Sequence, residues 1–354
     1  MTTLLPVPRI RAAAPAGEAA SVRPLGDAYG RVATDLRVSL TDRCNLRCQY
    51  CMPAEGLDWL PRADVLTDEE TLRLIRIGVT RLGITTVRLT GGEPLLRRDL
   101  EWLVASIADL DPAPAIALTT NGIGLAERAA TLAAAGLTRI NVSLDTLDPQ
   151  TFKLITRRPR IADVLAGVDA AVAAGLQPVK INTVLLRGVN DHEAYPLLEW
   201  ALRTGVQLRF IEQMPLDAQH AWSRQEMITA DEIRERLSAH VTLVEDERDR
   251  ARRGSAPAEL FRVQGTDGVV GIIASVSKPF CGACDRVRLT ADGQIRNCLF
   301  ARTESDLRAT LRAWATDDEL AEQWVRAVAT KRPGHGIDDP SFLQPDRPMS
   351  AIGG

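Results

Sequence analysis

Residues 44–51 read CNLRCQYC, and this stretch directs the interpretation of the whole chain. It brings Cys44, Cys48 and Cys51 together within one short segment. A second group of three cysteines, far along the chain, completes the set of six: Cys281, Cys284 and Cys298. Thiolates at such short spacings typically hold an iron–sulfur cluster, which normally takes four ligands. Three ligands leave one iron open, so each group predicts a cluster with a free position for a substrate or cofactor.

Disulfides and zinc are the alternative uses of these cysteines. A chain of 354 residues can bury a large core without disulfides. Its first twenty residues lack the apolar run of a secretory signal, and no apolar stretch is long enough to span a membrane. We therefore expect a cytoplasmic protein with reduced thiols. Zinc stays open for Cys281-x-x-Cys284 with Cys298 and is less favoured for the first group, whose spacing is unusual for a zinc finger.

Composition sets further bounds on the function. A hydrophobic content of 45% and a charged content of 25% are ordinary for a globular protein. The net charge of −3 argues against a general nucleic-acid binder, which is normally basic. We expect a flexible arm over residues 1–30, a main domain over 31–230, a second domain with the distal cysteines over 231–330, and a Gly/Pro-rich tail over 331–354.

The middle of the chain alternates between strand and helix patterns. Short β-branched runs predict strands at 36–40, 86–90, 115–119, 139–144, 179–185 and 207–212. Amphipathic periodicity predicts helices at 68–82, 99–109, 125–135, 161–174 and 191–204. Thr67 with Glu70 is typical of a capping box, and Asn190 is a candidate cap for the last of these helices. Six strand–helix units in a row predict a parallel sheet with right-handed crossovers.

Polar residues recur at alternating positions of these strands. They are Arg37, Ser39, Arg88, Thr90, Asn141, Ser143, Asp145, Lys180, Asn182, Gln207 and Arg209. Such a face is either the solvent side of a half-exposed sheet or the lining of a shared polar lumen. We favour the lumen, because buried Arg and Lys need partners and a polyphosphate would satisfy them.

Distinctive sequences also follow the strand ends, where strand–helix barrels carry their active sites. Six units rather than eight indicate an incomplete barrel that is open on one side. The predicted fold is therefore α/β, an incomplete (β/α)6 TIM-like barrel with a C-terminal α+β extension that carries the second cysteine group.

Several motifs together resemble one known family. CNLRCQYC has the CxxxCxxC pattern of radical S-adenosylmethionine (SAM) enzymes. The wider set is LTDRCNLRCQYCMP from residue 40, RLTGGEPLLRRDL from 88, LTTNG from 118, NVSLDTL from 141, CGAC…C with RVRLT from 286, and SAIGG from 350. Over residues 35–354 the chain resembles the GTP 3′,8-cyclase family, also called molybdenum cofactor biosynthesis protein A.

The resemblance implies two 4Fe–4S clusters, each held by three cysteines. Cys44, Cys48 and Cys51 would hold the cluster that binds and cleaves SAM, and Cys281, Cys284 and Cys298 a second cluster that binds the guanine of GTP. SAM contacts would come from Tyr50, Gly92, Ser143 and Met214. GTP contacts would come from Arg37, Arg88, Thr119, Lys180, Arg286 and Arg288.

Three further assignments have different origins. The resemblance places Arg286 with the first three cysteines among the catalytic residues. It also implies that the tail residues Gly353 and Gly354 reach into the active site, so that a residue added after Gly354 would lower activity without unfolding. Arg209 is added as a GTP-binding candidate from the polar pattern alone.

The implied reaction converts GTP to (8S)-3′,8-cyclo-7,8-dihydro-GTP, the first step of molybdenum cofactor biosynthesis. A 5′-deoxyadenosyl radical from SAM would take the hydrogen from the 3′ carbon of GTP, and the ribose radical would attack carbon 8 of the guanine. Implied partners are a cellular electron donor, a downstream cyclic pyranopterin monophosphate synthase and a second copy in a homodimer, with no nucleic acid and no membrane. The alternatives are a radical enzyme that acts on a peptide and a zinc-binding scaffold without chemistry.

Overall fold

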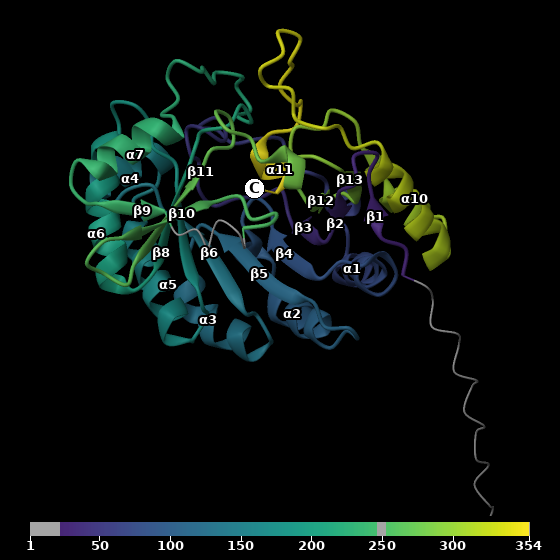
Figure 1. Cartoon of the computed structure of the whole chain (residues 1–354). Coiled ribbons are helices and arrows are strands. Elements are labelled where there is room, and N and C mark those ends of the chain that lie inside the picture. The colour runs from purple at the N-terminus through teal and green to yellow at the C-terminus, as the bar shows by residue number, and fades with distance from the viewer. Residues whose placement is uncertain (1–21, 246–252, 354) are drawn as a thin grey trace, which may run out of the picture.

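A computed structural model describes residues 22–245 and 253–353, and most of their strands join one curved sheet (Figure 1). The twelve strands of this sheet follow the order β14-β13-β12-β3-β4-β5-β6-β7-β8-β11-β10-β9. The short strands β1 (Leu25–Gly26) and β2 (Val32–Ala33) form a separate antiparallel pair. The large sheet is open, because its first and last members are different edge strands.

Six parallel strands in sequence order form the centre of the sheet, as predicted. The strands are β3 (Asp35–Ser39), β4 (Thr86–Thr90), β5 (Ala115–Thr120), β6 (Arg139–Ser143), β7 (Val179–Thr183) and β8 (Gln207–Ile211). The helices between them are α1 (Asp68–Leu82), α2 (Leu100–Ala108), α3 (Leu125–Ala134), α4 (Pro149–Thr156), α5 (Ile161–Ala173) and α6 (Ala194–Thr204). All six strands and five of these helices lie within a few residues of their predicted ranges.

The C-terminal part of the chain extends the sheet at both ends. Next to β8 come β11 (Val269–Ile273), which runs parallel to it, then β10 (Glu259–Val263) and β9 (Leu243–Glu245), with α7 (Ala230–Ser238) preceding them. Next to β3 come β12 (Arg286–Leu289), again parallel, then β13 (Gln294–Arg296) and β14 (Ser305–Asp306). The chain finishes with α9 (Leu307–Arg312), α10 (Asp317–Ala329) and the short α11 (Met349–Ile352).

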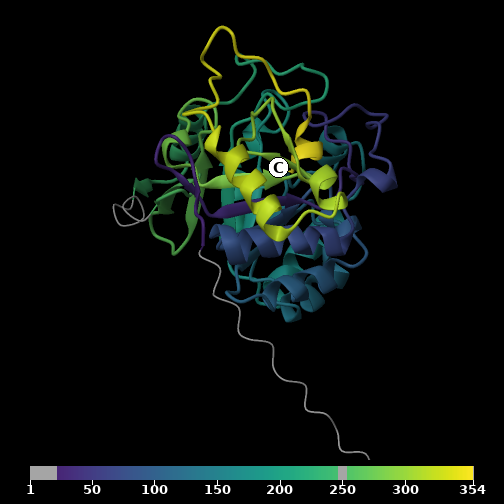
Figure 2. The same ribbon diagram turned by 90° about the vertical axis from the view of Figure 1, so that its right-hand side faces the viewer.

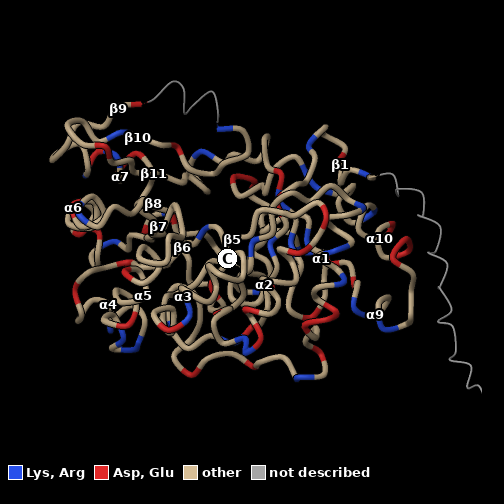
Figure 3. The backbone as a smooth tube through the Cα atoms, turned by 90° about the horizontal axis from the view of Figure 1, so that it is seen from below, with Lys and Arg blue, Asp and Glu red and all other residues tan. Residues whose placement is uncertain are grey.

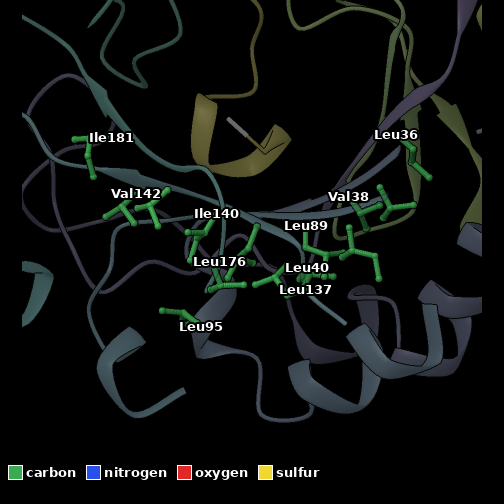
Figure 4. Packing of buried hydrophobic residues seen from close by; sticks show 14 of the residues in the cluster. Leu36, Val38, Leu40, Leu89, Leu95, Leu137, Ile140, Val142, Leu176 and Ile181 are labelled. Carbon is green, nitrogen blue, oxygen red and sulfur yellow. The ribbon is translucent and has the colours of Figure 1, made fainter. Parts of the chain in front are cut away.

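The hydrophobic core lies between the sheet and the helices on its convex side. Figure 4 shows side chains such as Leu36, Val38 and Ile140 on the helix-facing side of the strands, with α11 on the opposite side. These three side chains are essentially inaccessible to solvent. Because α11 occupies the concave side, the described end of the chain lies inside the curve of the sheet (Figures 1 and 2).

Local sequence signals mark the starts of α1 and α4, whereas the cap predicted at Asn190 is wrong. Thr67 and Glu70 form the predicted capping box of α1, and Gly83 ends that helix in the left-handed conformation. Asn190 does not cap a helix through its side chain. Its side-chain oxygen instead accepts from the Leu186 amide, and its side-chain nitrogen donates to the Val184 and Asp145 carbonyls. The helix α4 was not predicted, although Asp148 caps it and Pro149 opens it.

The predicted arm, residues 1–30, lies largely outside the described residues. The remainder carries β1, whose Leu25 is fully buried, so packed chain already begins before residue 31. The helix α10 packs against both α1 and β1 (Figure 2). Acidic and basic residues are interspersed over the outer helices (Figure 3), in keeping with the small net charge. No helix in the described ranges is both long and apolar enough to cross a bilayer.

Candidate active site

The first three cysteines lie on the loop that leaves the carboxyl end of β3. They line a cavity of about 160 Å³ together with Gly91 and Gly92 from the end of β4. The predicted SAM contacts Tyr50 and Ser143 line the same cavity. The side-chain amide of Asn121 donates to the Cys44 sulfur at 3.8 Å. The parallel sheet therefore gathers these segments at one edge, because consecutive parallel strands end on the same side.

The Gly91-Gly92-Glu93 turn holds the cysteine loop through its backbone. The Gly92 amide donates to the Thr41 carbonyl at 2.7 Å, and the Glu93 amide donates to the Arg43 carbonyl at 2.8 Å. A Cβ atom on Gly92 would lie 2.3 Å from the Arg43 carbonyl oxygen, a contact no side chain can make. Glycine is thus required here by the neighbouring backbone of the chain itself.

A buried carboxylate reinforces this turn. Glu93 accepts hydrogen bonds from the Leu95 and Asn121 amides and from the Thr120 hydroxyl at 2.6–2.9 Å. Burial raises its pKa to about 7, although these bonds and Arg128 oppose the shift. The carboxylate therefore links β4 to the end of β5 beneath the cysteines.

Burial is also the largest influence on the pKa values of the first three thiols. It raises the pKa of Cys44, raises that of Cys48 well above its ordinary value and raises that of Cys51 to about 12. All six cysteines are free of disulfides. Among the residues that the structure describes, no set of three Cys, His, Asp or Glu side chains is close enough to hold a single metal ion. Three partly buried thiols around a cavity fit a cluster, in which each thiolate would bind a different iron.

Tyr50 is fixed by a carboxylate that ends β6. Its hydroxyl donates to an oxygen of Asp145 at 2.6 Å, and the other oxygen of Asp145 accepts from the Val184 amide at 2.9 Å. Burial raises the pKa of Asp145 to about 6, and both hydrogen bonds oppose the shift. This hydrogen bond fixes the Tyr50 ring on the wall of the smaller cavity, beside Cys48 and Cys51.

A larger cavity of about 390 Å³ lies over the concave face of the sheet. Eight predicted side chains line it: Arg37, Arg88, Thr119, Lys180, Arg209, Met214, Arg286 and Arg288. The alternating polar face therefore lines a cavity rather than open solvent, as we favoured. Thr90, Ser143 and Asp145, nearer the strand ends, line the smaller cavity instead, and Ser39 and Gln207 line neither.

Strand register explains why the cations converge. Arg37 pairs with Arg288 of β12 on one side and with Arg88 of β4 on the other, so three guanidinium groups share one row. In the adjoining rows, Asn182 pairs with Arg209, while Asn141 pairs with Lys180. Side chains in register on neighbouring strands point the same way. Like charges placed this close repel, so the row favours an anionic ligand.

These cations have unused hydrogen-bonding capacity. Within the described residues, Nε of Arg37 and both Nε and Nη1 of Arg88 are buried without a hydrogen-bond partner. Burial, together with the charges of neighbouring arginines, lowers the pKa of Arg37 and Arg209 to about 10 and that of Lys180 to about 7. An unpartnered buried donor is costly, so such donors aimed into a cavity fit the oxygens of a polyphosphate.

The second cysteine group closes one side of this larger cavity. Cys281, Cys284 and Cys298 all line it, beside Arg286. Burial would raise the pKa of the Cys284 thiol, but Arg286 and Lys331 outweigh that effect and leave the pKa below its ordinary value. Burial raises the pKa of Cys281. A thiol already biased toward thiolate is a favourable ligand for iron.

The tail reaches the row of arginines. Arg288 donates a hydrogen bond to the Gly353 carbonyl. Gly353 is buried with φ at +76°, and a Cβ atom there would lie 2.7 Å from Thr90. The predicted tail residue Gly353 is therefore next to the site, while Gly354 lies outside the described residues.

The two cavities adjoin each other. Thr119, at the end of β5, and Met349, at the start of α11, line both of them. The structure thus brings nearly all predicted site residues into two neighbouring chambers. Met214 lines the larger chamber, not the one around the first cysteines to which the SAM assignment belongs.

Sequence reasoning missed several lining residues. Asp35 and Arg139 lie at the start of their strands and share the inward parity of Arg37 and Asn141, so the same alternation could have identified them. Arg253 and Ser255 come from the loop before β10 and carry no local signal. Lys331, which contacts Cys284, follows α10, where a lysine is common at a helix end and gives no signal of a site.

Comparison with known proteins gives a consistent result. Residues 38–201 match the Radical SAM superfamily, and residues 206–337 match Molybdenum Cofactor Synthesis C. GTP 3′,8-cyclase of Mycobacterium sp. (strain KMS) is 60% identical over 352 residues, covering 99% of both chains. GTP 3′,8-cyclase of Streptomyces coelicolor is 61% identical over 328 residues, covering 93% of this chain and 96% of its own.

Solved structures share the fold at low sequence identity. SuiB of Streptococcus suis, bound to the precursor peptide SuiA, aligns with a TM-score of 0.58 at 14% identity, over 85% of this chain and 67% of its own. The enzyme anSMEcpe with bound AdoMet aligns with a TM-score of 0.57 at 14% identity, over 88% of this chain and 81% of its own. These likenesses concern the fold alone.

Proposed function

Since the chain belongs to the GTP 3′,8-cyclase family of the radical SAM superfamily, we propose a role for each part of its two-chambered site. The chain is a radical SAM enzyme that cyclises GTP in molybdenum cofactor synthesis. Membership implies a 4Fe–4S cluster, SAM as cofactor and GTP as substrate. The assignment of these groups to particular residues is our proposal.

The smaller chamber is the proposed site of SAM. Cys44, Cys48 and Cys51 would hold the 4Fe–4S cluster, which when bound would supply one-electron reduction of SAM. Tyr50, fixed by Asp145, lies against the adenine. The Gly91-Gly92 turn offers backbone groups to the methionine end, and Ser143 contacts the cofactor from β6. Met214 is proposed to reach SAM from the wall of the larger chamber.

The larger chamber is the proposed site of GTP. Arg37, Arg88, Lys180 and Arg209 bind the phosphates, and Thr119 lies between GTP and SAM. Cys281, Cys284 and Cys298 would hold a second 4Fe–4S cluster, which would bind the guanine. Arg286 and Arg288 bind GTP beside it, with Arg286 as a catalytic residue and Gly353 and Gly354 completing the site. The unpartnered guanidinium nitrogens support this arrangement, because a triphosphate would satisfy them.

The single observation that carries this proposal is the wall that both chambers share. Thr119 and Met349 line each chamber, so the two proposed ligands would sit directly against each other. The shared wall would place the ribose of GTP beside SAM without bulk water between them. The protein's contribution is to fix that orientation and to exclude solvent.

The sheet also suggests a fold description. We propose that β3 to β8 form an incomplete (β/α)6 TIM-like barrel, and that β9 to β14 with α7, α9 and α10 form an α+β extension. The parallel order of the six strands and the position of the site at their carboxyl ends support this description. The divisions near residues 31, 231 and 331 remain our proposal for the domains.

An anaerobic assay tests the proposed roles. The reconstituted chain is incubated with SAM, a strong reductant and either GTP or ATP, and 5′-deoxyadenosine and nucleotide products are followed by mass. We expect a GTP-dependent product isomeric with dihydro-cyclised GTP. Serine at Cys281, Cys284 and Cys298 should remove about half of the iron and abolish this product while SAM cleavage persists. Unchanged iron content in that variant would contradict the second cluster.

Three partners complete the proposal. An electron donor must reduce the first cluster, since reductive cleavage consumes an electron. The product would pass to a cyclic pyranopterin monophosphate synthase. We also propose a homodimer, which sedimentation of the cluster-loaded chain would test by mass.

A further inference from the structure

We propose that Lys331 is a positioning residue of the second cluster, and that its ammonium group holds the Cys284 sulfur and raises the reduction potential of that cluster. The inference rests on the second cluster of the proposed function. It concerns a residue that comes after α10 in the chain, outside the cysteine motif and outside the barrel strands.

The contacts of Lys331 are specific. Its Nζ donates to the Cys284 sulfur at 3.4 Å, to the Cys284 carbonyl at 3.1 Å and to the Arg286 carbonyl at 2.9 Å. An ammonium group has three donors, so these acceptors use all of them. The side chain therefore bridges one cysteine of the group to the start of β12 and is aimed at a sulfur atom.

The charge of Lys331 is buried and lacks a carboxylate partner. The residue is 4% exposed. In residues 22–245 and 253–353, no Asp or Glu lies within ion-pair distance of its Nζ, and its acceptors are two carbonyls and one thiol. A buried ammonium without a counter-charge is unfavourable. Something anionic at the cysteines would therefore resolve the imbalance.

An iron–sulfur cluster supplies that anion. Three thiolates outweigh the charge of an oxidised 4Fe–4S core, and reduction adds a further negative charge. A fixed cation and an N–H···S hydrogen bond stabilise the more negative, reduced state. Hydrogen bonds to the sulfurs and local charge are among the means by which proteins set cluster potentials.

Arg31 offers a matched contrast within the same site. Its guanidinium donates to the Cys281 carbonyl at 2.8 Å, so it also holds a proposed ligand residue. Unlike Lys331, it is paired with a carboxylate, Asp27, at 2.5 Å and makes no hydrogen bond to sulfur in the described structure. The pair Arg31–Asp27 therefore braces the loop without adding net charge. Variants of the two residues therefore separate the effect of an added positive charge from the effect of holding the cysteine loop in place.

The test is an EPR-monitored redox titration of the full-length, cluster-loaded chain. The second cluster's signal is identified by its loss in Cys281→Ser. We expect Lys331→Met to lower the midpoint potential of that cluster and the fraction reduced at a fixed solution potential, with the first cluster unchanged. Lys331→Arg should stay near the wild type. The double variant Asp27→Asn with Arg31→Gln, which conserves net charge, should not shift the potential.

Each other outcome has a definite meaning. A Lys331→Met chain with full iron and an unshifted potential overturns the inference, and so does an equal shift in the double variant. If Lys331→Met does not load the second cluster, rescue by Lys331→Arg but not by Lys331→Gln supports the role of charge. If Lys331→Met, Lys331→Arg and Lys331→Gln all fail to load the second cluster, the inference is overturned, because the site would then need the shape of lysine rather than its charge. A wild type that loads only one cluster would instead refute the second cluster of the proposed function.

Discussion

At the scale of single residues, the decisive feature is the excess of positive charge in the larger cavity. Its lining holds more Arg and Lys side chains than Asp and Glu side chains. Arg37, Arg88 and Arg288 form one row, and Lys180 and Arg209 stand in the adjoining rows. Burial and mutual repulsion both disfavour their charged forms. A polyanionic substrate reverses both effects, so ligand binding and protonation should be coupled.

Lys180 makes that coupling measurable. Burial, with Arg209, Arg139 and Arg88, lowers its pKa in the empty cavity to about 7. Bound phosphates would raise this pKa, so above pH 7 GTP binding takes up a proton and the affinity falls as pH rises, by up to about tenfold per pH unit. Calorimetry in buffers of different ionisation enthalpy, above the titration of the phosphates themselves, would measure the uptake.

The control for Lys180 is the substitution Lys180→Arg. Arginine keeps its proton in this range, so GTP affinity should lose most of its pH dependence. An equally steep dependence in that variant would assign the proton to another group.

Arg139 is a further residue-scale prediction. It lines the larger cavity, and its charge lowers the pKa of Lys180 and Arg209. We expect Arg139→Ala to weaken GTP binding by about tenfold, the effect of losing one charge-assisted contact, with SAM binding unchanged. Arg203→Ala, in an exposed pair with Glu199, is the matched control. Equal GTP affinities in the two variants would remove Arg139 from the site.

At the scale of elements, the turn after β4 and the cysteine loop after β3 form one unit. A Cβ atom on Gly92 would lie 2.3 Å and 2.5 Å from the carbonyl oxygens of Arg43 and Asp42. We expect Gly92→Ala to lower the free energy of unfolding by about 1–3 kcal/mol and to reduce loading of the first cluster. Gly26→Ala, which meets nothing within 4 Å, should do neither. Thermal unfolding and iron content would measure both effects.

The tail is the second element with a sharp steric requirement. At Gly353 a Cβ atom would lie 2.7 Å from Thr90, and φ is +76°. An alanine there is strained by about 1–2 kcal/mol, which the short tail can relieve by moving out of the site. We expect Gly353→Ala to lower cyclase activity with little change in melting temperature. Full activity in this variant would contradict the steric requirement for glycine at position 353.

At the scale of the whole molecule, the two chambers depend on segments that are far apart in sequence. The helix α11 forms part of the wall between them through Met349. The Met349 amide donates a hydrogen bond to the Leu216 carbonyl at 2.9 Å. We expect deletion of residues 349–354 to leave SAM cleavage intact but to uncouple it from cyclisation. The ratio of cyclised nucleotide to 5′-deoxyadenosine, measured by mass, should fall several-fold. An unchanged ratio would mean that α11 plays no part in coupling.

Much of this architecture could be predicted from local sequence. The six strands and five of the helices follow from periodicity, and the start of α1 follows from its capping box, because each signal acts within a few residues. Alternation along the strands also predicted which cations would share a face. The helix α4 was missed although its start carried Asp148 and Pro149, because it lies in a connection that was expected to hold only α5.

The sequence by itself determined the two groups of three cysteines, the order of the strand–helix units and the inward parity of Arg37, Arg88, Lys180 and Arg209. These depend on spacing along the chain. Only the tertiary structure decided that β12 lies beside β3, which sets Arg288 next to Arg37, and that Lys331 reaches the Cys284 sulfur. Such contacts join residues that are distant in sequence, and no local pattern encodes them. They arise because the late strands extend the curved sheet at both ends and the tail folds over its concave face.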